Sequence, residues 1–135
     1  MVGVVEERNK AIVERVYREG YNGGDESVYA ELYKPDFFHH SKTLHDVGQG
    51  ADAERQSMLR FRDSMPDAHF EITGMVAEGD MVSVQLHVTG TPRHDFGNVL
   101  ATDGGFDRRC LALFRLEGGL LAEEWFYIDG GAPAQ

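Results

Sequence analysis

The chain has 135 residues, a formal charge of −10, 41% hydrophobic residues and a single cysteine. This length and composition fit one folded domain with a hydrophobic core rather than a disordered chain. The acidic balance argues against nucleic-acid binding, because a phosphate-binding face needs clustered Lys and Arg. Cys110 alone cannot form an intramolecular disulfide, and no apolar run approaches the ~20 residues of a membrane span. Since the N-terminus is acidic where a signal peptide would be basic, a cytoplasmic location is expected.

Two helices are predicted at the start of the chain. Apolar residues at helical spacing, with charges on the opposite face, predict a helix over 4–21. The glycine-rich segment at 22–25 ends this helix. Asp25 or Ser27 then caps a second short helix, which ends before Pro35.

The next part of the chain predicts a strand, a loop and a helix. Aromatic and β-compatible residues at 36–41 indicate a short strand. Residues 42–50 contain two glycines without periodicity and are expected to form a loop. A third helix is predicted from Asp52 to Arg62, because Pro66 follows shortly after.

From Ala68 onward the hydrophobic period changes to two, which indicates strands. Strands are predicted at 69–77 and 81–89, joined by a turn at 78–80, and a second hairpin at 109–129 turns at 117–119. Helices followed by antiparallel strands indicate an α+β fold, with the helices laid against one face of a curved sheet. Such a bent sheet leaves a cone-shaped cavity that suits a small molecule.

Six motifs lie along nearly the whole chain in one characteristic order. They are Tyr-Asn-Gly-Gly-Asp at 21–25, Pro-Asp-Phe-Phe-His-His at 35–40, Met-Pro-Asp at 65–67, Glu-Gly-Asp-Met-Val at 78–82, Gly-Thr at 90–91, and the stretch 114–129. In this order the chain resembles the SnoaL-like polyketide cyclase branch of the NTF2-like superfamily. The resemblance implies a single domain over 1–135, a cone-shaped barrel that dimerises through its sheet, and a deep pocket for a small hydrophobic or aromatic ligand. It also implies that no metal or organic cofactor is needed.

In the aromatic polyketide cyclases of this branch, an Asp on the last strand and a His on the preceding strand serve an aldol ring closure. Aligned without gaps through Arg115 and the glycine turn, these two positions hold Phe126 and Ala112 here. Glu124 shares the face of Phe126 and lies one pleat away, so it is the candidate general acid or base if an apolar wall raises its pKa. The alternative is a salt bridge from Glu124 to Arg109 or Arg115.

Histidines follow the predicted first strand, and His40 is the candidate partner of Glu124. The matching motif often carries histidine at the pocket wall in this family, and an imidazole can move a proton near neutral pH. The alternative is that His40 ties the strand to the following loop. His39, on the opposite face, is expected to be exposed. Because this pair cannot bind one metal ion from one face, and His45 lies in a loop, no metal site is expected.

Aromatic side chains are the candidate substrate contacts. Tyr21 matches a position where related cyclases place an aromatic ring against the substrate, and Tyr17 shares its helix face. A phenol combines an apolar body with a polar tip and suits an aromatic ligand. Phe38 and Phe126 are expected as further pocket walls. Core packing is the alternative for both tyrosines.

A polar stripe on the predicted strand at 81–89 leaves two possibilities open. Gln85 and His87 belong to this stripe, which lies opposite a row of valine and leucine side chains. If the stripe lines the cavity, both residues contact the ligand. If the valine face packs inward, the stripe meets a dimer partner.

The family resemblance, with Glu124 and His40 expected in an apolar cavity, implies a cofactor-independent enzyme of secondary metabolism, such as antibiotic biosynthesis. It would catalyse ring closure, isomerisation or dehydration by proton transfer on a small hydrophobic, oxygenated substrate. One alternative is an epoxide hydrolase, which needs a second carboxylate beside Glu124, with Asp80 and Asp107 as candidates. The other is a module that binds a ligand without transforming it. A polar network with a raised Glu124 pKa favours an enzyme, whereas a Glu124–arginine salt bridge favours the binding module.

Overall fold

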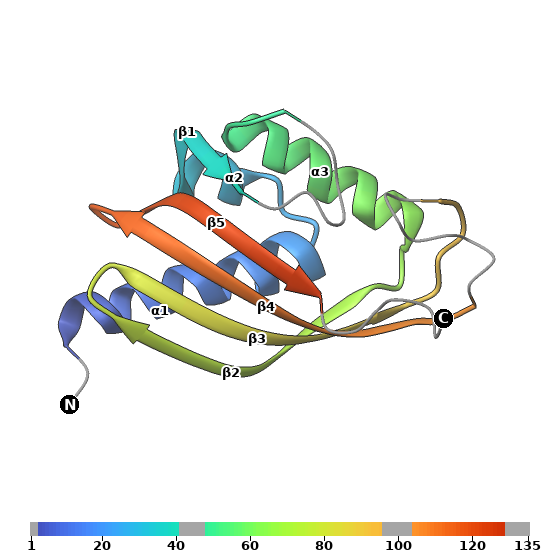
Figure 1. Ribbon diagram of the computed structural model, residues 1–135. Helices are drawn as coiled ribbons and strands as arrows, with labels where there is room; N and C mark the ends of the chain where they lie inside the picture. Colours follow the sequence, from blue (N-terminus) through green and yellow to red (C-terminus); the bar gives the residue numbers. More distant parts are fainter. Residues whose placement is uncertain (1–2, 41–47, 96–103, 129–135) are drawn as a thin grey trace.

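The computed structural model describes residues 3–40, 48–95 and 104–128. The helical segments α1 (Val4–Arg15), η1 (Val16–Asn22) and α2 (Ser27–Leu32) come first. They are followed by β1 (Tyr33–His39), α3 (Ala51–Ser64), β2 (His69–Glu78), β3 (Met81–Gly90), β4 (Phe106–Glu117) and β5 (Leu120–Ile128) (Figure 1). This is the predicted α+β order. Most of the predicted loop at 42–50, and the last residue of the predicted hairpin, lie outside the described residues.

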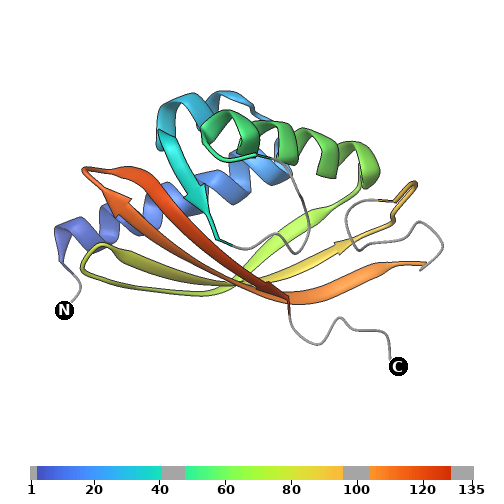
Figure 2. The same ribbon diagram turned by 45° about the horizontal axis from the view of Figure 1, so that its top comes forward.

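The strands form one curved sheet in the order β1-β5-β4-β3-β2. Neighbours from β2 to β5 are antiparallel, whereas β1 pairs with β5 in parallel. The sheet is therefore mixed, where the sequence predicted a wholly antiparallel one. The helices all lie on one side of the sheet, inside its curve (Figures 1 and 2). The core consequently lies between this inner face and the helices.

The predicted helix over 4–21 is confirmed, but its last part is a π-helix rather than an α-helix. The π-helix η1 contains Gly20, which packs directly against α2: a Cβ atom at Gly20 would lie 3.1 Å from Val28 Cγ2. Wider turns of this kind are rare and often occur at functional sites. Within the described part of the chain, each helix lacks the length or the apolar character that crossing a membrane requires.

Both predicted hairpin turns are confirmed, and glycines make them possible. Gly79 has φ 61° between β2 and β3, and Gly118 and Gly119 have φ 55° and 84° between β4 and β5. Only glycine adopts such positive φ values without a steric cost. Two strand starts differ from the prediction, because β1 begins at Tyr33 and β4 at Phe106.

The valine face of β3 points into the core. Val82, Val84, Leu86 and Val88 are each at most 1% exposed, and they pack with aromatic side chains of the helices and the other strands. The polar stripe of β3 therefore lies on the outer face of the sheet. Cys110 on β4 is buried.

Asn22 joins the end of η1 to the edge strand β2. Its Nδ2 donates to the carbonyl oxygen of Phe70 at 2.9 Å, and its Oδ1 accepts from the Phe70 N–H at 2.7 Å. The Asn22 side chain thus forms the pair of hydrogen bonds that the backbone of a neighbouring strand would form with β2. Arg62 on α3 donates to the carbonyl oxygen of Tyr21 at 2.6 Å, which fixes the same turn from the other side.

Replacing Asn22 by alanine is expected to destabilise the fold by about 1–3 kcal/mol, because both partly buried Phe70 backbone groups lose their partner. Urea unfolding followed by circular dichroism measures this loss. Asn22→Asp serves as the control: it keeps the acceptor for the Phe70 N–H but loses the donor, and should fall between alanine and the wild type. An Asn22→Ala variant as stable as the wild type would show that the clamp contributes nothing.

Candidate functional site

The inner face of the sheet brings His39 on β1 next to Glu124 on β5. The two residues are direct partners in the parallel register of these strands. Both side chains lie in the interior, with His39 5% and Glu124 6% exposed. The imidazole Nε2 lies 3.4 Å from Glu124 Oε1. Two groups able to exchange a proton therefore lie side by side in the core.

Backbone contacts on both sides of β1 fix the position of His39. Its N–H donates to Gln49 Oε1 at 2.8 Å, and Gln49 Nε2 donates to its carbonyl oxygen at 3.1 Å. On the other side, the N–H of His40 donates to the carbonyl oxygen of Glu124 at 2.8 Å. The end of β1 is thus held between β5 and a side chain that replaces a further strand.

A second buried carboxyl group, that of Glu54, reaches the same place from α3. Glu54 is 2% exposed and lies on the buried face of this helix with Ser57, Met58 and Phe61. One nitrogen or carboxylate oxygen from each of His39, Glu54 and Glu124 lies within 4.8 Å of the other two. We call these three residues the buried cluster. It joins the consecutive elements β1 and α3 to β5, which lies near the other end of the chain.

Burial raises the pKa of both carboxyl groups in this cluster. Loss of hydration raises the pKa of Glu54 to about 8. The pKa of Glu124 lies well above its ordinary value, mainly because of burial and secondly because of the nearby Glu54 charge. Among the residues described, neither carboxylate forms an ion pair with Lys or Arg. A carboxyl proton is therefore available near neutral pH.

Aromatic rings pack around the buried cluster. The ring of Phe37 meets that of His39 edge-on, with centroids 6.5 Å apart. Tyr17 and Tyr21 stack at 5.6 Å, and Tyr21 packs on Phe70 at 4.7 Å. The pKa of Tyr17 is raised by burial and then by the charge of Glu124. As predicted, both tyrosines share one face of their helix.

Tyr29 contributes a polar group that the core leaves unsatisfied. Its side chain is 2% exposed, and its hydroxyl has no hydrogen-bond partner of normal geometry among the described residues. Burial, followed by the charges of Glu54 and Glu124, raises its pKa, and the neighbouring Tyr21 side chain, whose contact lies outside normal hydrogen-bond geometry, lowers it. A buried hydroxyl without a partner costs free energy and is uncommon in folded proteins.

The predicted pairing of His40 with Glu124 is wrong, and His39 takes that place. His40 is exposed, lies 2.7 Å from Glu123 Oε2 and stacks on Trp125 with centroids 4.4 Å apart. The reason is the register with β5, which turns Phe37 and His39 inward. Side chains alternate along a strand, so their neighbours must face outward.

Phe38 shares the outward face of His40 and is 46% exposed. The sequence led us to expect Phe38 as a wall of the pocket beside Glu124, but its side chain does not line the interior. Phe37, which is fully buried, supplies the inward-facing ring at this point of β1. Phe126 lies where it was predicted, on the buried face of β5 with Glu124 and opposite Ala112.

The salt bridge that the sequence left open for Glu124 is formed instead by the adjacent residue, Glu123, with Arg115. Arg115 Nε contacts Glu123 Oε1, and Arg115 Nη1 donates to Glu117 Oε2 at 2.6 Å. The guanidinium lowers the pKa of Glu123, and the His40 contact lowers it further. Adjacent glutamates on β5 thus have opposite environments: Glu123 is ion-paired near the surface, and Glu124 is buried.

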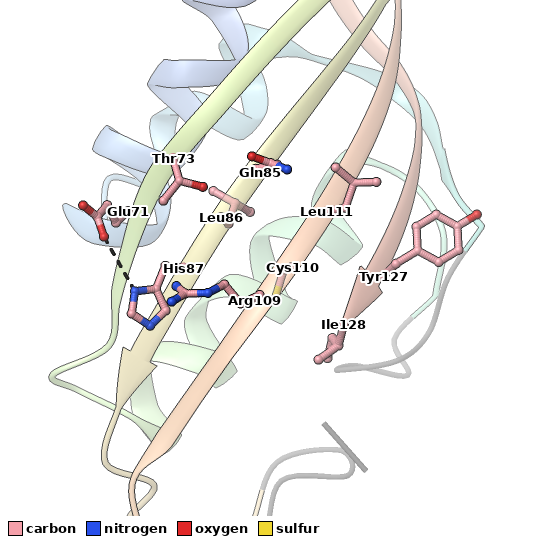
Figure 3. Close-up of a pocket in the computed structure, with 10 residues that line it drawn as sticks. All are labelled: Glu71, Thr73, Gln85, Leu86, His87, Arg109, Cys110, Leu111, Tyr127 and Ile128. Atoms are coloured by element: carbon pink, nitrogen blue, oxygen red, sulfur yellow. Dashed lines mark ion pairs between the residues drawn. The ribbon is translucent and has the colours of Figure 1, made fainter. Parts of the chain in front are cut away.

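Gln85 and His87 lie on the outer face of the sheet, away from the buried cluster. They line a groove of about 810 Å³ together with residues of β2, β4 and β5 (Figure 3). His87 Nε2 lies 2.6 Å from Asp107 Oδ1, and its Nδ1 lies 3.6 Å from Glu71 Oε1. Because the valine face of β3 packs inward, these two predicted ligand contacts are not part of one site with Glu124.

Glu54, the second carboxyl group, was not among the site residues predicted from the sequence. Asp80 lies exposed at the turn after β2, and Asp107 is exposed beside His87, so neither joins the buried cluster. A signal for Glu54 was present in the sequence. It lies three, four and seven residues before Ser57, Met58 and Phe61, which is the spacing of one helix face. An acidic residue on a buried stripe is unusual and marks a candidate site.

The comparisons with known proteins agree with this fold. A family model described as SnoaL-like polyketide cyclase matches residues 11–135. The chain therefore belongs to the SnoaL-like polyketide cyclase family, and its mixed sheet with inner helices is the NTF2-like fold. The search among curated proteins finds no match.

Similar solved structures include a protein from Jannaschia sp. CCS1 assigned as a SnoaL-like polyketide cyclase. It has 24% identity and a TM-score of 0.81, over 96% of this chain and 90% of that one. TsrD from Streptomyces laurentii has 20% identity and a TM-score of 0.81, over 96% and 92% of the two chains. IdmH from Streptomyces antibioticus, assigned as a polyketide cyclase, has 23% identity and a TM-score of 0.75, over 90% and 91%.

Replacing Glu54 by glutamine is expected to make the protein more stable at pH 8 than the wild type, with a smaller difference at pH 5. The folded wild type holds the Glu54 proton up to about pH 8, whereas the ordinary pKa is 4.5. Its free energy of unfolding therefore falls as the pH rises between these values, by about 1.4 kcal/mol for each unit of pKa shift at most. Glutamine has no proton to lose.

Urea unfolding from pH 5 to 9, in buffer containing a chelator, measures this difference. Glu78→Gln, at the exposed end of β2, is the matched control and should follow the wild-type curve. A Glu54→Gln variant whose pH dependence equals that of the wild type would contradict the raised pKa.

Proposed function

We propose that this protein is an enzyme of secondary metabolism that moves a proton on a small hydrophobic, oxygenated substrate by means of Glu124 and His39. The reaction is of the cyclase or isomerase type. Membership of the SnoaL-like polyketide cyclase family supports this class of reaction. The proposal otherwise rests on side chains of this chain alone.

The observation that carries the proposal is the buried pair itself, with His39 Nε2 3.4 Å from Glu124 Oε1. An acid–base pair is costly to bury, so it is kept where it has a use. Aromatic side chains around it provide an apolar environment for a ring-containing substrate, and the raised pKa of Glu124 brings this carboxyl group closer to neutral pH. Both features support an enzyme over a module that only binds.

Ring closure illustrates how the pair would act. One member takes a proton from the carbon beside a carbonyl, and the resulting enolate carbon bonds to a second carbonyl carbon of the same substrate. The other member gives a proton to the oxygen of that second carbonyl. One proton is taken and one is given, so the step needs no oxidant or reductant. Glu54 acts through Glu124 by raising its pKa, and is a positioning residue in this scheme.

An epoxide-opening hydrolase is the second candidate, and the proximity of Glu54 to Glu124 is what favours it. One protonated carboxyl group could donate to the epoxide oxygen while the other, ionised, takes a proton from the attacking water. Water and epoxide together then give a diol, with the protons balanced. The second carboxyl group that this reaction needs beside Glu124 is Glu54 on α3, rather than Asp80 or Asp107.

Glu124→Gln and His39→Ala are each expected to reduce proton abstraction at least 100-fold, the usual scale of general acid–base catalysis. Deuterium uptake by the carbon beside the carbonyl of aryl ketones and 1,3-diketones, followed by NMR in D₂O, measures this step without knowledge of the natural substrate. Incubation of the same variants with aryl epoxides, with diol formation followed by NMR, tests the second candidate.

His40→Ala and Glu123→Gln are the matched controls, because they remove the outward-facing histidine–glutamate pair and should retain activity within about twofold. Unchanged exchange in Glu124→Gln would remove Glu124 from the mechanism. A wild type that binds these ketones without accelerating exchange or ring opening would establish the binding module instead.

A further inference from the structure

The buried cluster has the composition of a metal-binding site. His39 offers an imidazole nitrogen, and Glu54 and Glu124 offer carboxylate oxygens, with one such atom of each within 4.8 Å of the others. Imidazole and carboxylate together suit divalent first-row ions such as Zn²⁺. The donors come from β1, α3 and β5, so the fold rather than one local motif assembles them.

Distances in the cluster are close to those of zinc coordination. At Zn–N and Zn–O bonds of roughly 2.0–2.2 Å, two ligands of a tetrahedral ion lie about 3.4 Å apart. His39 Nε2 and Glu124 Oε1 are separated by 3.4 Å. The Glu54 oxygen lies within 4.8 Å of the other two donors, so it needs to approach by about 1.4 Å at most, which rotation of the Glu54 side chain on α3 can supply.

The charge of the cluster also favours a divalent cation. Metal binding releases the protons that the buried carboxyl groups otherwise hold near neutral pH, and with both groups ionised and the imidazole neutral the cluster carries two negative charges in the interior. Across the described ranges, neither Glu54 nor Glu124 has a Lys or Arg partner that would offset them. One Zn²⁺ balances this charge and satisfies the carboxylates together.

The hydroxyl of Tyr29 is a second, independent observation. It is buried, lacks a hydrogen-bond partner of normal geometry in the described part of the chain, and lies where the charges of Glu54 and Glu124 act on it. A water molecule or hydroxide in the open position of a three-ligand zinc site would give this hydroxyl a partner.

We infer that His39, Glu54 and Glu124 form a binding site for one divalent transition-metal ion, with Zn²⁺ as the expected ion. This differs from the expectation drawn from the sequence, which considered only His39, His40 and His45; His45 lies outside the described residues. A bound Zn²⁺ occupies the atoms of Glu124 and His39 that the proposed reaction uses. Metal binding and proton transfer therefore exclude one another at this site.

Isothermal titration of the chelator-stripped full-length chain with ZnCl₂ tests this inference without any substrate. We expect one Zn²⁺ per chain with a dissociation constant in the micromolar range or below, and absorption bands of four-coordinate Co²⁺ when CoCl₂ replaces zinc. Glu54→Gln and His39→Ala should each weaken binding at least tenfold. Mg²⁺ and Ca²⁺, which prefer six or more oxygen ligands, should not compete.

The double variant His40→Ala, Glu123→Gln is the matched control, because it removes the same residue types from the outer face of the same two strands. It should bind Zn²⁺ as the wild type does. Circular dichroism of each variant confirms that it is folded. Absence of binding to the wild type, equal binding by folded Glu54→Gln, or loss of binding in the double variant would each overturn the inference.

Discussion

The parallel pairing of β1 with β5 is the constraint on which the interior of this protein depends. It joins the first strand of the chain to the last, and it places His39 directly opposite Glu124. The antiparallel strands β2 to β5 would form a curved sheet without it, but the space between that sheet and α3 would then lack its only buried imidazole among the described residues. Gln49 and β5 hold β1 from its two sides, so the histidine has little freedom to leave this position.

The buried cluster is a local cost to stability that the surrounding core must offset. Carboxyl groups lose hydration in the interior, and Glu54 and Glu124 also repel each other when both are ionised. Aromatic packing around them is extensive: Tyr17 and Tyr21, for example, stack on one another and on Phe70. A core of this kind agrees with the general finding that functional sites depart from the packing rules that the rest of a fold obeys.

Much of the fold could be predicted from the sequence, because helical and strand periods and glycine turns are local signals. The inward direction of Glu124 followed from the same alternation as that of Phe126. The direction of His39 could not be predicted in this way, since a short strand can present either face until its partner is known. That partner, β5, lies more than 80 residues further along the chain. Glu54 carried a helical-face signal, but its place beside His39 and Glu124 emerges only when α3 packs over β1 and β5.

The adjacent pairs His39–His40 and Glu123–Glu124 raise the question of what fixes the register of β1 and β5. A shift of β1 and β5 by one residue each would turn His40 and Glu123 inward and still leave a histidine and a glutamate facing the core. The acid–base residues therefore do not define the register. The ion pairs do, because the shift would exchange Phe37 and Phe126 for the adjacent aromatic side chains but would bury Glu123, which is paired with Arg115 near the surface. In this protein, a surface ion pair selects which of two chemically similar histidine–glutamate pairs becomes the interior one.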